Sequence, residues 1–267
     1  MAFIGKEYYR SFLLKRLSKF IKKGDVISAE FDLSKYSKLV HFFKEKEKFA
    51  LFFINIILKL IGDKGILIIP TFTYSWGKDK KKKIFNIKKA IPNLGIIPKT
   101  ILPLKNVNRT NDPMFSFAVL GSKKKREYFC KTSNNSFGKN SVYEKVLINK
   151  GKLLSFGLSQ FDPTFVHYVE QYFHENFKKL NYRYMKTFSG YFVDKRKKKF
   201  FRKHKSFVRK IDSNYLYSEK KIKRKLKKEK KLKVINFLKT KIYICNSQDF
   251  FKYGFESLKK DKYFFVN

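Results

Sequence analysis

Apolar positions in the first seventy residues alternate between a helical spacing and short continuous runs. Residues 5–23 carry apolar side chains along one helical face, and Gly24 ends that segment. Residues 26–31 are a short run that suits a strand, and residues 47–61 form a second, strongly apolar helix. The continuous apolar run 66–69 is typical of a strand buried on both faces. This order predicts a βαβ unit within a three-layer α/β/α fold that has a central mixed sheet.

Shorter elements follow along the rest of the chain. We expect a Lys-rich loop over 77–90, a short helix opened by 92–98, a polar turn over 108–113, a strand over 115–120 and a helix over 142–149. Beyond residue 182 we expect a basic β-hairpin over 183–208, strands over 233–236 and 240–245, and a helix over 247–259. No linker is evident, so the chain is predicted to form one domain over residues 1–267.

The stretch 151–175 combines a predicted strand, a tight turn and a predicted helix. Its strand is the run 153–156, closed by Gly157. Residues 159–163 have the composition of a helix start, with Asp162 able to cap free N–H groups and Pro163 suited to the first turn. The helix that follows carries the residues of greatest chemical interest.

His167 and Glu170 stand three residues apart and therefore share one helical face. A carboxylate there can orient and polarise the imidazole, which then acts as a general base near neutral pH. The same spacing is also common on solvated helices, where it has no catalytic meaning. Adding His174 gives a face that could hold a metal, but the spacing is not that of a zinc helix and no further ligand cluster is evident, so metal is the weaker interpretation.

The charge of the chain is extreme, because 63 Lys and Arg residues oppose 21 Asp and Glu residues and give a formal net charge of +42. Such a balance is compatible with nucleic-acid binding through phosphate neutralisation. Most of the cations are lysines scattered among Phe, Ile, Tyr and Asn, so compositional drift explains them as well. The cation-dominated segment 218–231 is interpreted as a solvated helix or loop, with a nucleic-acid arm as the alternative.

Cys130 and Cys245 are the only cysteines, which indicates no disulfide framework and a reducing compartment. The N-terminal segment lacks the apolar centre and cleavage site of a signal peptide, and the apolar run 49–61 is too short to span a bilayer. These features predict a cytoplasmic protein.

Taken in order, several short motifs resemble those of the aminoglycoside 3-N-acetyltransferase family, also called the antibiotic N-acetyltransferases. The resemblance covers roughly residues 20–192 and leaves a divergent basic part over 193–267. The matching residues are Gly24 to Ile27, Gly62, Gly65, Leu67, Pro70 to Thr73, Gly95 to Pro98, Arg109 to Pro113, Ser116, Gly121, Phe137, Gly138, Ser141, and Leu153 to Thr164 with His167 and Glu170.

The resemblance implies an enzyme that uses an acyl-CoA, usually acetyl-CoA, to acylate the amine of a sugar-like acceptor. It implies His167 as the general base and Glu170 as its orienting partner. The turns that hold Thr71, Phe72 and Thr73, and Arg109 to Ser116, would line the cofactor and the reaction centre. For Arg109, an equally good interpretation is a buried ion pair that braces the fold.

The sequence departs from the family where it places acidic residues near the presumed site. Glu30-Phe31-Asp32-Leu33 stands where the family often has His-Ser-Ser-Leu, and Asp112 replaces a common histidine. Glu30, Asp32 and Asp112 are therefore candidate ligands of a cationic amine, although Glu30 and Asp32 could instead pair with the abundant lysines. The hypothesis is an N-acetyltransferase acting on an amino sugar, either aminoglycoside-like or nucleotide-linked for a surface glycan.

Other functions remain open from the sequence. An inactive acetyltransferase scaffold could bind nucleic acid or another polyanion through residues 195–231, where Phe and Tyr are interleaved with cations. Peripheral contact with an anionic membrane and assembly into a homodimer are further possible partnerships.

Overall fold

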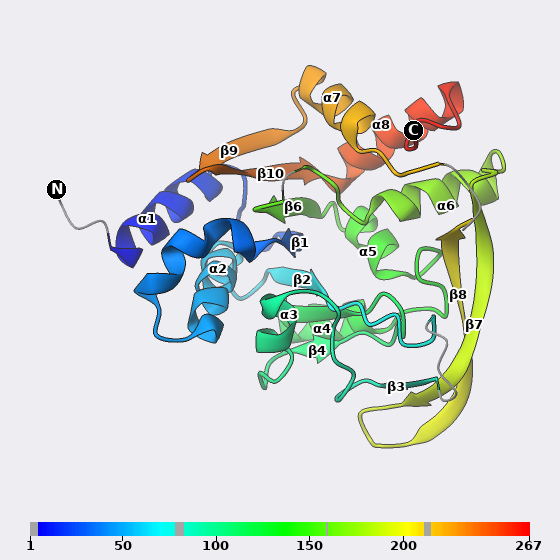
Figure 1. Cartoon of the computed structure of the whole chain (residues 1–267), viewed down its shortest axis with the longest axis horizontal. Coiled ribbons are helices and arrows are strands. Elements are labelled where there is room, and N and C mark those ends of the chain that lie inside the picture. Colours follow the sequence, from blue (N-terminus) through cyan, green and yellow to red (C-terminus); the bar gives the residue numbers. More distant parts are fainter. Residues whose placement is uncertain (1–4, 78–82, 159, 211–214) are drawn as a thin grey trace.

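The computed structural model describes residues 5–77, 83–158, 160–210 and 215–267, and it shows a seven-stranded sheet with helices on both faces (Figure 1). The helical segments are α1 (Lys6–Leu17), the 3-10 segment η1 (Leu33–Phe42), α2 (Lys46–Ile61), α3 (Ile96–Ile101), α4 (Lys123–Cys130), α5 (Val142–Ile148), α6 (Val166–Asn176), α7 (Lys220–Lys228) and α8 (Ser247–Lys260). The strands are β1 (Val26–Phe31), β2 (Ile66–Pro70), β3 (Ile84–Asn86), β4 (Asn108–Arg109), β5 (Phe117–Gly121), β6 (Lys152–Phe156), β7 (Arg183–Val193), β8 (Lys199–Arg209), β9 (Lys233–Phe237) and β10 (Thr240–Asn246).

The large sheet is mixed, in the order β4-β5-β2-β1-β6-β10-β9. Its three central strands β2, β1 and β6 run parallel, and antiparallel strands extend the sheet on both sides. All five residues of β2 are buried, because helices cover both faces of this strand. The carboxyl ends of the parallel strands lie along one edge, which is where open α/β sheets bind ligands.

Two separate cores lie on the two faces of this sheet. One is formed with α1, η1, α2 and α3, around side chains such as Tyr36 and Phe53. The other is formed with α4 to α8, around side chains such as Phe165 and Phe250. The predicted three-layer arrangement with a mixed sheet is therefore confirmed.

A second sheet, in the order β3-β7-β8, lies at one side of the molecule (Figure 1). The predicted basic hairpin is confirmed as β7 and β8, which pair antiparallel over their whole length. The prediction of a loop over 77–90 was wrong at residues 84–86, which pair with β7 as strand β3; residues 78–82 lie outside the described residues. The pairing is stabilised by burial of Phe85 against Trp76 and Phe192, which local sequence does not show.

Segment α7 is a helix, but it is not simply solvated. Ile222 and Leu226 are fully buried, whereas Lys220, Lys221 and Arg224 on the same helix are exposed. Their i, i+4 spacing places both on one face, which packs into the core beside α8.

Candidate active site

Helix α6 is placed by the connection that follows β6, at the edge where the parallel strands end. The prediction that this helix starts at Asp162 and Pro163 was wrong, because α6 begins at Val166 after a turn in which the Val166 N–H donates to the carbonyl of Pro163. Ser159, also assigned to that start, lies outside the described residues. The free N–H of Thr164 donates instead to Glu30 Oε1 on β1, at 2.9 Å. A carboxylate from another strand thus replaces the expected local cap.

His167 and Glu170 form the predicted pair in the first turns of α6, with His167 Nδ1 3.0 Å from Glu170 Oε2. The same carboxylate oxygen lies 2.8 Å from Nε of Arg183, at the start of β7. The Glu170 side chain is fully buried and that of Arg183 is 8% exposed, whereas 21% of the His167 side chain reaches the surface. The imidazole of His167 is therefore the accessible group of this array, and the ion pair of Glu170 and Arg183 beneath it is buried.

Electrostatics in this array favour a neutral imidazole beside an ionised carboxylate. Burial lowers the pKa of His167, and the nearby Arg183 cation lowers it further, against the opposing effect of Glu170. Burial raises the pKa of Glu170, but Arg183 and the hydrogen bond from His167 outweigh it, so the net direction is down. If Nδ1 carries the imidazole proton and donates to Glu170, Nε2 is left with a free lone pair. That is the state of a general base.

Aromatic rings limit the space around the imidazole. The Phe137 ring stands edge-on to it with 5.4 Å between centroids, and the Tyr217 ring lies 6.2 Å away. Phe137 comes from the turn before α5 and Tyr217 from the segment before α7. The base is thus enclosed by segments that are far apart in the sequence.

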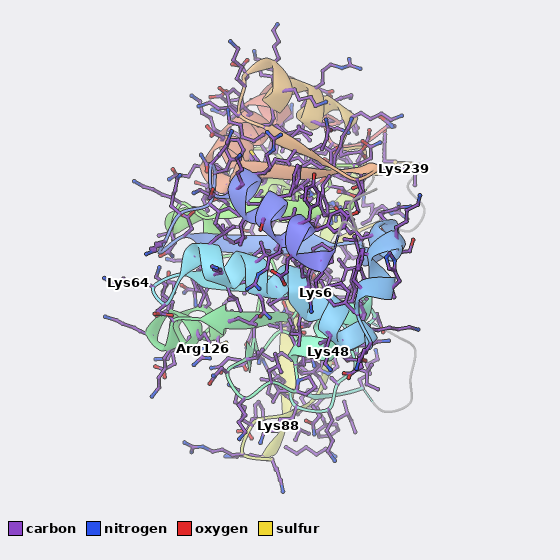
Figure 2. All side chains as sticks on the ribbon, turned by 90° about the vertical axis from the view of Figure 1, so that its left-hand side faces the viewer. Lys6, Lys48, Lys64, Lys88, Arg126 and Lys239 are labelled. Carbon is purple, nitrogen blue, oxygen red and sulfur yellow. The ribbon has the colours of Figure 1, made fainter. Side chains whose placement is uncertain are left out.

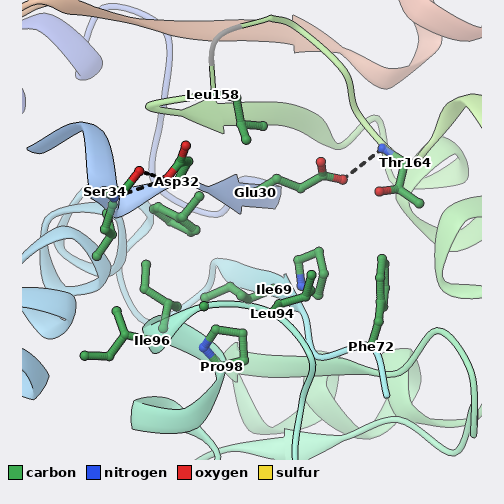
Figure 3. Close-up of a pocket in the computed structure, with 15 residues that line it drawn as sticks. Glu30, Asp32, Ser34, Ile69, Phe72, Leu94, Ile96, Pro98, Leu158 and Thr164 are labelled. Carbon is green, nitrogen blue, oxygen red and sulfur yellow. Dashed lines mark hydrogen bonds between the residues drawn. The ribbon is translucent and has the colours of Figure 1, made fainter. Parts of the chain in front are cut away.

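A cavity of about 410 Å³ opens at the carboxyl ends of β1 and β2, next to the turn that precedes α6 (Figure 3). Its wall is largely apolar, with Phe72, Leu94 and Ile96 among the contributing side chains. Glu30 and Thr164 line one end, where their hydrogen bond closes the wall (Figure 3). Among the described residues the lining includes no Lys or Arg, which is unusual for a chain of net charge +42.

The two acidic residues predicted on this side both line the cavity. Burial raises the pKa of Glu30 to about 7, although the N–H of Thr164 opposes the shift. Asp32 Oδ1 accepts from both the N–H and the hydroxyl of Ser34, at 3.1 and 2.5 Å, and so caps the start of η1. Neither carboxylate forms a lysine ion pair within the described ranges, so the expectation of simple lysine pairing was wrong.

Thr71, Arg109 and Ser116 form one buried hydrogen-bonded cluster behind the cavity wall. Arg109 Nε donates to Ser116 Oγ at 3.1 Å, Nη2 donates to the carbonyl of Thr71 at 2.8 Å, and Nη1 donates to the carbonyl of Ala90. Arg109 also stacks over Phe85, and burial lowers its pKa to about 10. No acidic partner of Arg109 occurs in the described part of the chain, so Arg109 braces the fold through carbonyl oxygens rather than through an ion pair.

Thr73 and Asp112 are likewise held by internal bonds. Thr73 Oγ1 donates to the carbonyl of Pro113 at 2.9 Å. Asp112 Oδ1 accepts the N–H groups of Met114 and Phe115, and its Oδ2 lies 3.2 Å from Nε2 of the fully buried His204. Burial raises the pKa of Asp112, but His204 and the two N–H donors outweigh it and lower the pKa overall. Asp112 thus anchors strand β8 to the turn after β4.

Two of these partners were missed from the sequence. Arg183 and His204 stand on β7 and β8, about 13 and 92 residues from the carboxylates that they contact. Both lie inside a hairpin rich in cations, so composition gives no reason to select them. The signal that was available is that a buried carboxylate needs a cationic or donor partner.

Comparison with known proteins decides the family. The family model described as aminoglycoside 3-N-acetyltransferase matches residues 34–259, most of the chain. The chain belongs to this family. The match makes it an N-acetyltransferase, as the sequence predicted, and it reaches well past residue 192 into the basic part.

Solved structures share the fold of this family member at low identity. The apoenzyme of aminoglycoside acetyltransferase AAC(3)-IVa is 18% identical, with a TM-score of 0.70 over 97% of this chain and 91% of that one. The AAC-IIIb complex with CoASH is 16% identical, with a TM-score of 0.75 over 96% of both chains. The YokD protein from Bacillus subtilis is 14% identical, with a TM-score of 0.71 over 97% of this chain and 94% of that one. No curated protein matches the sequence.

A second, basic cavity in this acetyltransferase, of about 620 Å³, lies between β4, α4 and the tip of the hairpin. Two carboxylates line it, those of Glu127 and Asp194. The five cations that line it are Arg109, Lys131, Lys195, Arg196 and Arg202. Arg109 connects the two cavities. It lines the basic cavity, and it donates to the carbonyl of Thr71, the residue before Phe72 in the wall of the first cavity. The surplus of cations suits phosphate groups.

The described residues show neither a metal-ligand cluster nor a membrane-spanning helix. No group of three His, Cys, Asp or Glu side chains there is placed to hold a metal ion, and Nδ1 of His174 accepts the N–H of Leu180. None of the described helices has the length and apolar character needed to cross a membrane. Cys130 and Cys245 are both free thiols.

Proposed function

We propose that this acetyltransferase transfers an acetyl group from acetyl-CoA to the amine of an amino sugar, with His167 as the general base. The observation that carries the proposal is the array of His167, Glu170 and Arg183. It holds a neutral imidazole, partly exposed, on a buried ionised carboxylate. The family assignment and the CoASH-bound AAC-IIIb structure support acetyl-CoA as the donor.

The chemistry needs a base because a protonated amine is no nucleophile. In the proposed step His167 Nε2 takes a proton from the acceptor nitrogen as that nitrogen attacks the thioester carbonyl carbon. The new C–N bond forms, the C–S bond breaks, and the imidazolium of His167 returns the proton to the departing sulfur, so that CoA leaves as its thiol. Glu170 stabilises the imidazolium that forms on His167, and Arg183 keeps Glu170 ionised.

The proposed acceptor is an amino sugar that carries negative charge, such as a nucleotide-linked sugar, rather than a polycationic aminoglycoside. A protein of net charge +42 attracts anions and repels polycations at long range. The basic cavity offers Arg202, Lys195 and Arg196 to phosphates of a nucleotide or of CoA. Glu30 and Asp32 are the proposed partners of the single amine, within an otherwise apolar wall.

The remaining predicted residues have proposed roles that follow from their positions. Phe72 lines the cavity directly and is the proposed donor contact. Thr71, Thr73, Arg109 and Ser116 are proposed to keep the Phe72 loop in place through their buried hydrogen bonds. Asp112 is proposed to act in the same way, by fixing the neighbouring turn to β8.

The test is release of CoA thiol from acetyl-CoA with a panel of amino sugars, nucleotide-linked amino sugars and aminoglycosides. We expect turnover with a nucleotide-linked amino sugar and a loss of about 10²–10⁴-fold in His167→Ala. His41→Ala is the matched control, because His41 is exposed and away from the array, and it should keep full activity. Turnover that survives His167→Ala would exclude the base role.

Absence of both turnover and CoA binding would instead favour the alternative, an inactive scaffold that binds polyanions. Isothermal titration with CoA separates the two cases, because an active transferase with the wrong acceptor still binds its donor.

A further inference from the structure

The outer face of the three-stranded sheet carries a continuous row of exposed apolar side chains. Ile84 on β3 is paired with Tyr191 on β7, and Tyr191 is paired with Phe201 on β8. Directly paired residues share a face, so the three side chains lie side by side across the sheet. They are 41%, 44% and 58% exposed, and the rings of Tyr191 and Phe201 are in contact at 5.7 Å.

The inner face accounts for the structural needs of this sheet. Phe85, Phe188 and Phe192 alternate with the outer residues and are buried around Trp76. Gly190 lets Trp76 approach closely, since a Cβ there would lie 2.7 Å from its Nε1. The outer row therefore contributes nothing to the core, and a contiguous apolar patch of this kind marks an interaction surface.

Cations surround the row on the same face. Lys199, Lys203 and Lys205 follow the parity of Phe201 along β8 and are all exposed. Neither β7 nor β8 contains an acidic residue, although 21 occur in the whole chain. Asp194 in the hairpin turn accepts the N–H groups of Arg196 and Lys198, so it serves the turn itself.

The geometry of the row separates two kinds of anionic partner. Bases of single-stranded nucleic acid stack on ring faces. Here Lys199 Nζ lies 4.4 Å above the Tyr191 ring, and the Tyr191 and Phe201 planes meet at 78°. The third member, Ile84, has no ring. A row of aliphatic and aromatic side chains bordered by lysines suits the boundary between lipid headgroups and acyl chains instead.

We propose that this outer face binds the surface of an anionic lipid bilayer, with Ile84, Tyr191 and Phe201 inserted at the headgroup level and the three lysines on lipid phosphates. The hairpin extends along one side of the molecule in Figure 1. This proposal does not depend on the acetyl transfer proposed above.

The test is co-sedimentation of the full chain with vesicles of phosphatidylcholine alone or with one third phosphatidylglycerol, at 0.15 M salt. We expect binding to the anionic vesicles only, and a decrease of about tenfold or more in Tyr191→Ser/Phe201→Ser. Tyr8→Ser/Phe177→Ser is the matched control, because these rings are 56% and 56% exposed on other elements. It should bind like the unchanged protein.

Three results would overturn the proposal. One is no binding to anionic vesicles. Another is equal binding by both double variants, which would mean that diffuse charge alone attracts the lipid. The third is displacement of the vesicles by a single-stranded oligonucleotide whose binding requires Tyr191 and Phe201. That result would show that the face binds nucleic acid.

Discussion

At the residue scale, the organising feature is one carboxylate, Glu170, shared by a histidine and an arginine. Its Oε2 lies 3.0 Å from His167 Nδ1 and 2.8 Å from Arg183 Nε. A fully buried charge persists only when it is paired, and the pairing in turn keeps the imidazole oriented. The catalytic candidate and the stability of this region therefore depend on the same atoms.

Replacing Arg183 with Met should destabilise the protein by about 3–5 kcal/mol at pH 7, because Glu170 is left buried without its cation. In the unchanged protein the pKa of Glu170 is lowered, so its contribution is present above 4.5 and is lost as pH falls below that value. The destabilisation should accordingly shrink as pH falls below 4.5. Urea unfolding at pH 7 and at about pH 3 measures both values.

The control for this change is the double variant Arg183→Met/Glu170→Gln, which removes both charges. It should recover most of the stability while acetyl transfer stays low, because His167 has lost its carboxylate. A loss of stability in Arg183→Met that is the same at both pH values would contradict the ion-pair explanation.

Glu30→Gln should stabilise the protein at pH 8 by on the order of 2 kcal/mol and leave it nearly unchanged at pH 4. The pKa of Glu30 is raised from 4.5 to about 7 by burial, so the folded state holds a proton that the unfolded state releases in this window. The contribution is thus present below 4.5 and lost as pH rises to 7. Glutamine can still accept the N–H of Thr164. If the urea midpoints of Glu30→Gln and of the unchanged protein differ by the same amount at pH 4 and pH 8, this titration is ruled out.

At the scale of elements, strand pairing and helix faces decide which cations are structural. The hairpin β7–β8 brings Arg183 to α6 and His204 to the turn after β4, while the row of exposed apolar side chains lies near its tip. Helix α7 combines lysines on one side with buried Ile222 and Leu226 on the other. A segment dominated by charge can therefore be part of the core.

Ile222→Ala should cost about 2–4 kcal/mol of folding free energy, because the side chain is fully buried and leaves a cavity. Lys220→Ala, on the exposed side of the same helix, should change stability by less than about 0.5 kcal/mol. Denaturant unfolding of both variants gives the comparison. Equal, small effects would mean that α7 is only loosely attached.

At the scale of the whole molecule, charge is spread over the surface rather than gathered at one site. Figure 2 shows cationic side chains extending outward around the view, with Lys6 on α1, Arg126 on α4 and Lys239 between β9 and β10 among those labelled. The apolar cavity at Glu30 is an exception, since no cation occurs among the described residues that line it. The global field therefore attracts anions, while the local lining is the proposed site of the amine.

Raising the ionic strength from 0.05 to 0.5 M should increase the KM of a nucleotide-linked amino sugar by about tenfold, because salt screens the attraction to the surface. The KM of a polycationic aminoglycoside, if it is acetylated at all, should fall over the same range. Steady-state kinetics at constant acetyl-CoA checks both directions. A salt-independent KM for the anionic acceptor would show that the surface charge does not act on it.

Prediction from the sequence succeeded where local pattern and physical requirement coincide. The apolar runs at 26–31 and 66–69, the helix over 47–61 and the hairpin are all present with nearly the predicted bounds. His167 and Glu170 were found together because residues three positions apart on a helix share a face. Strand β3 was missed, since a run of three residues among lysines becomes a strand only through pairing with β7.

The amino-acid sequence by itself determined the layered α/β architecture, the family and the His167–Glu170 pair, because these follow from spacing within a few residues. Only the tertiary structure decided the partners of the buried charges: Arg183 for Glu170, His204 for Asp112 and the N–H of Thr164 for Glu30. The reason is physical. A buried charge must find a partner, but the partner is selected by the packing of distant strands and not by any local preference of the chain.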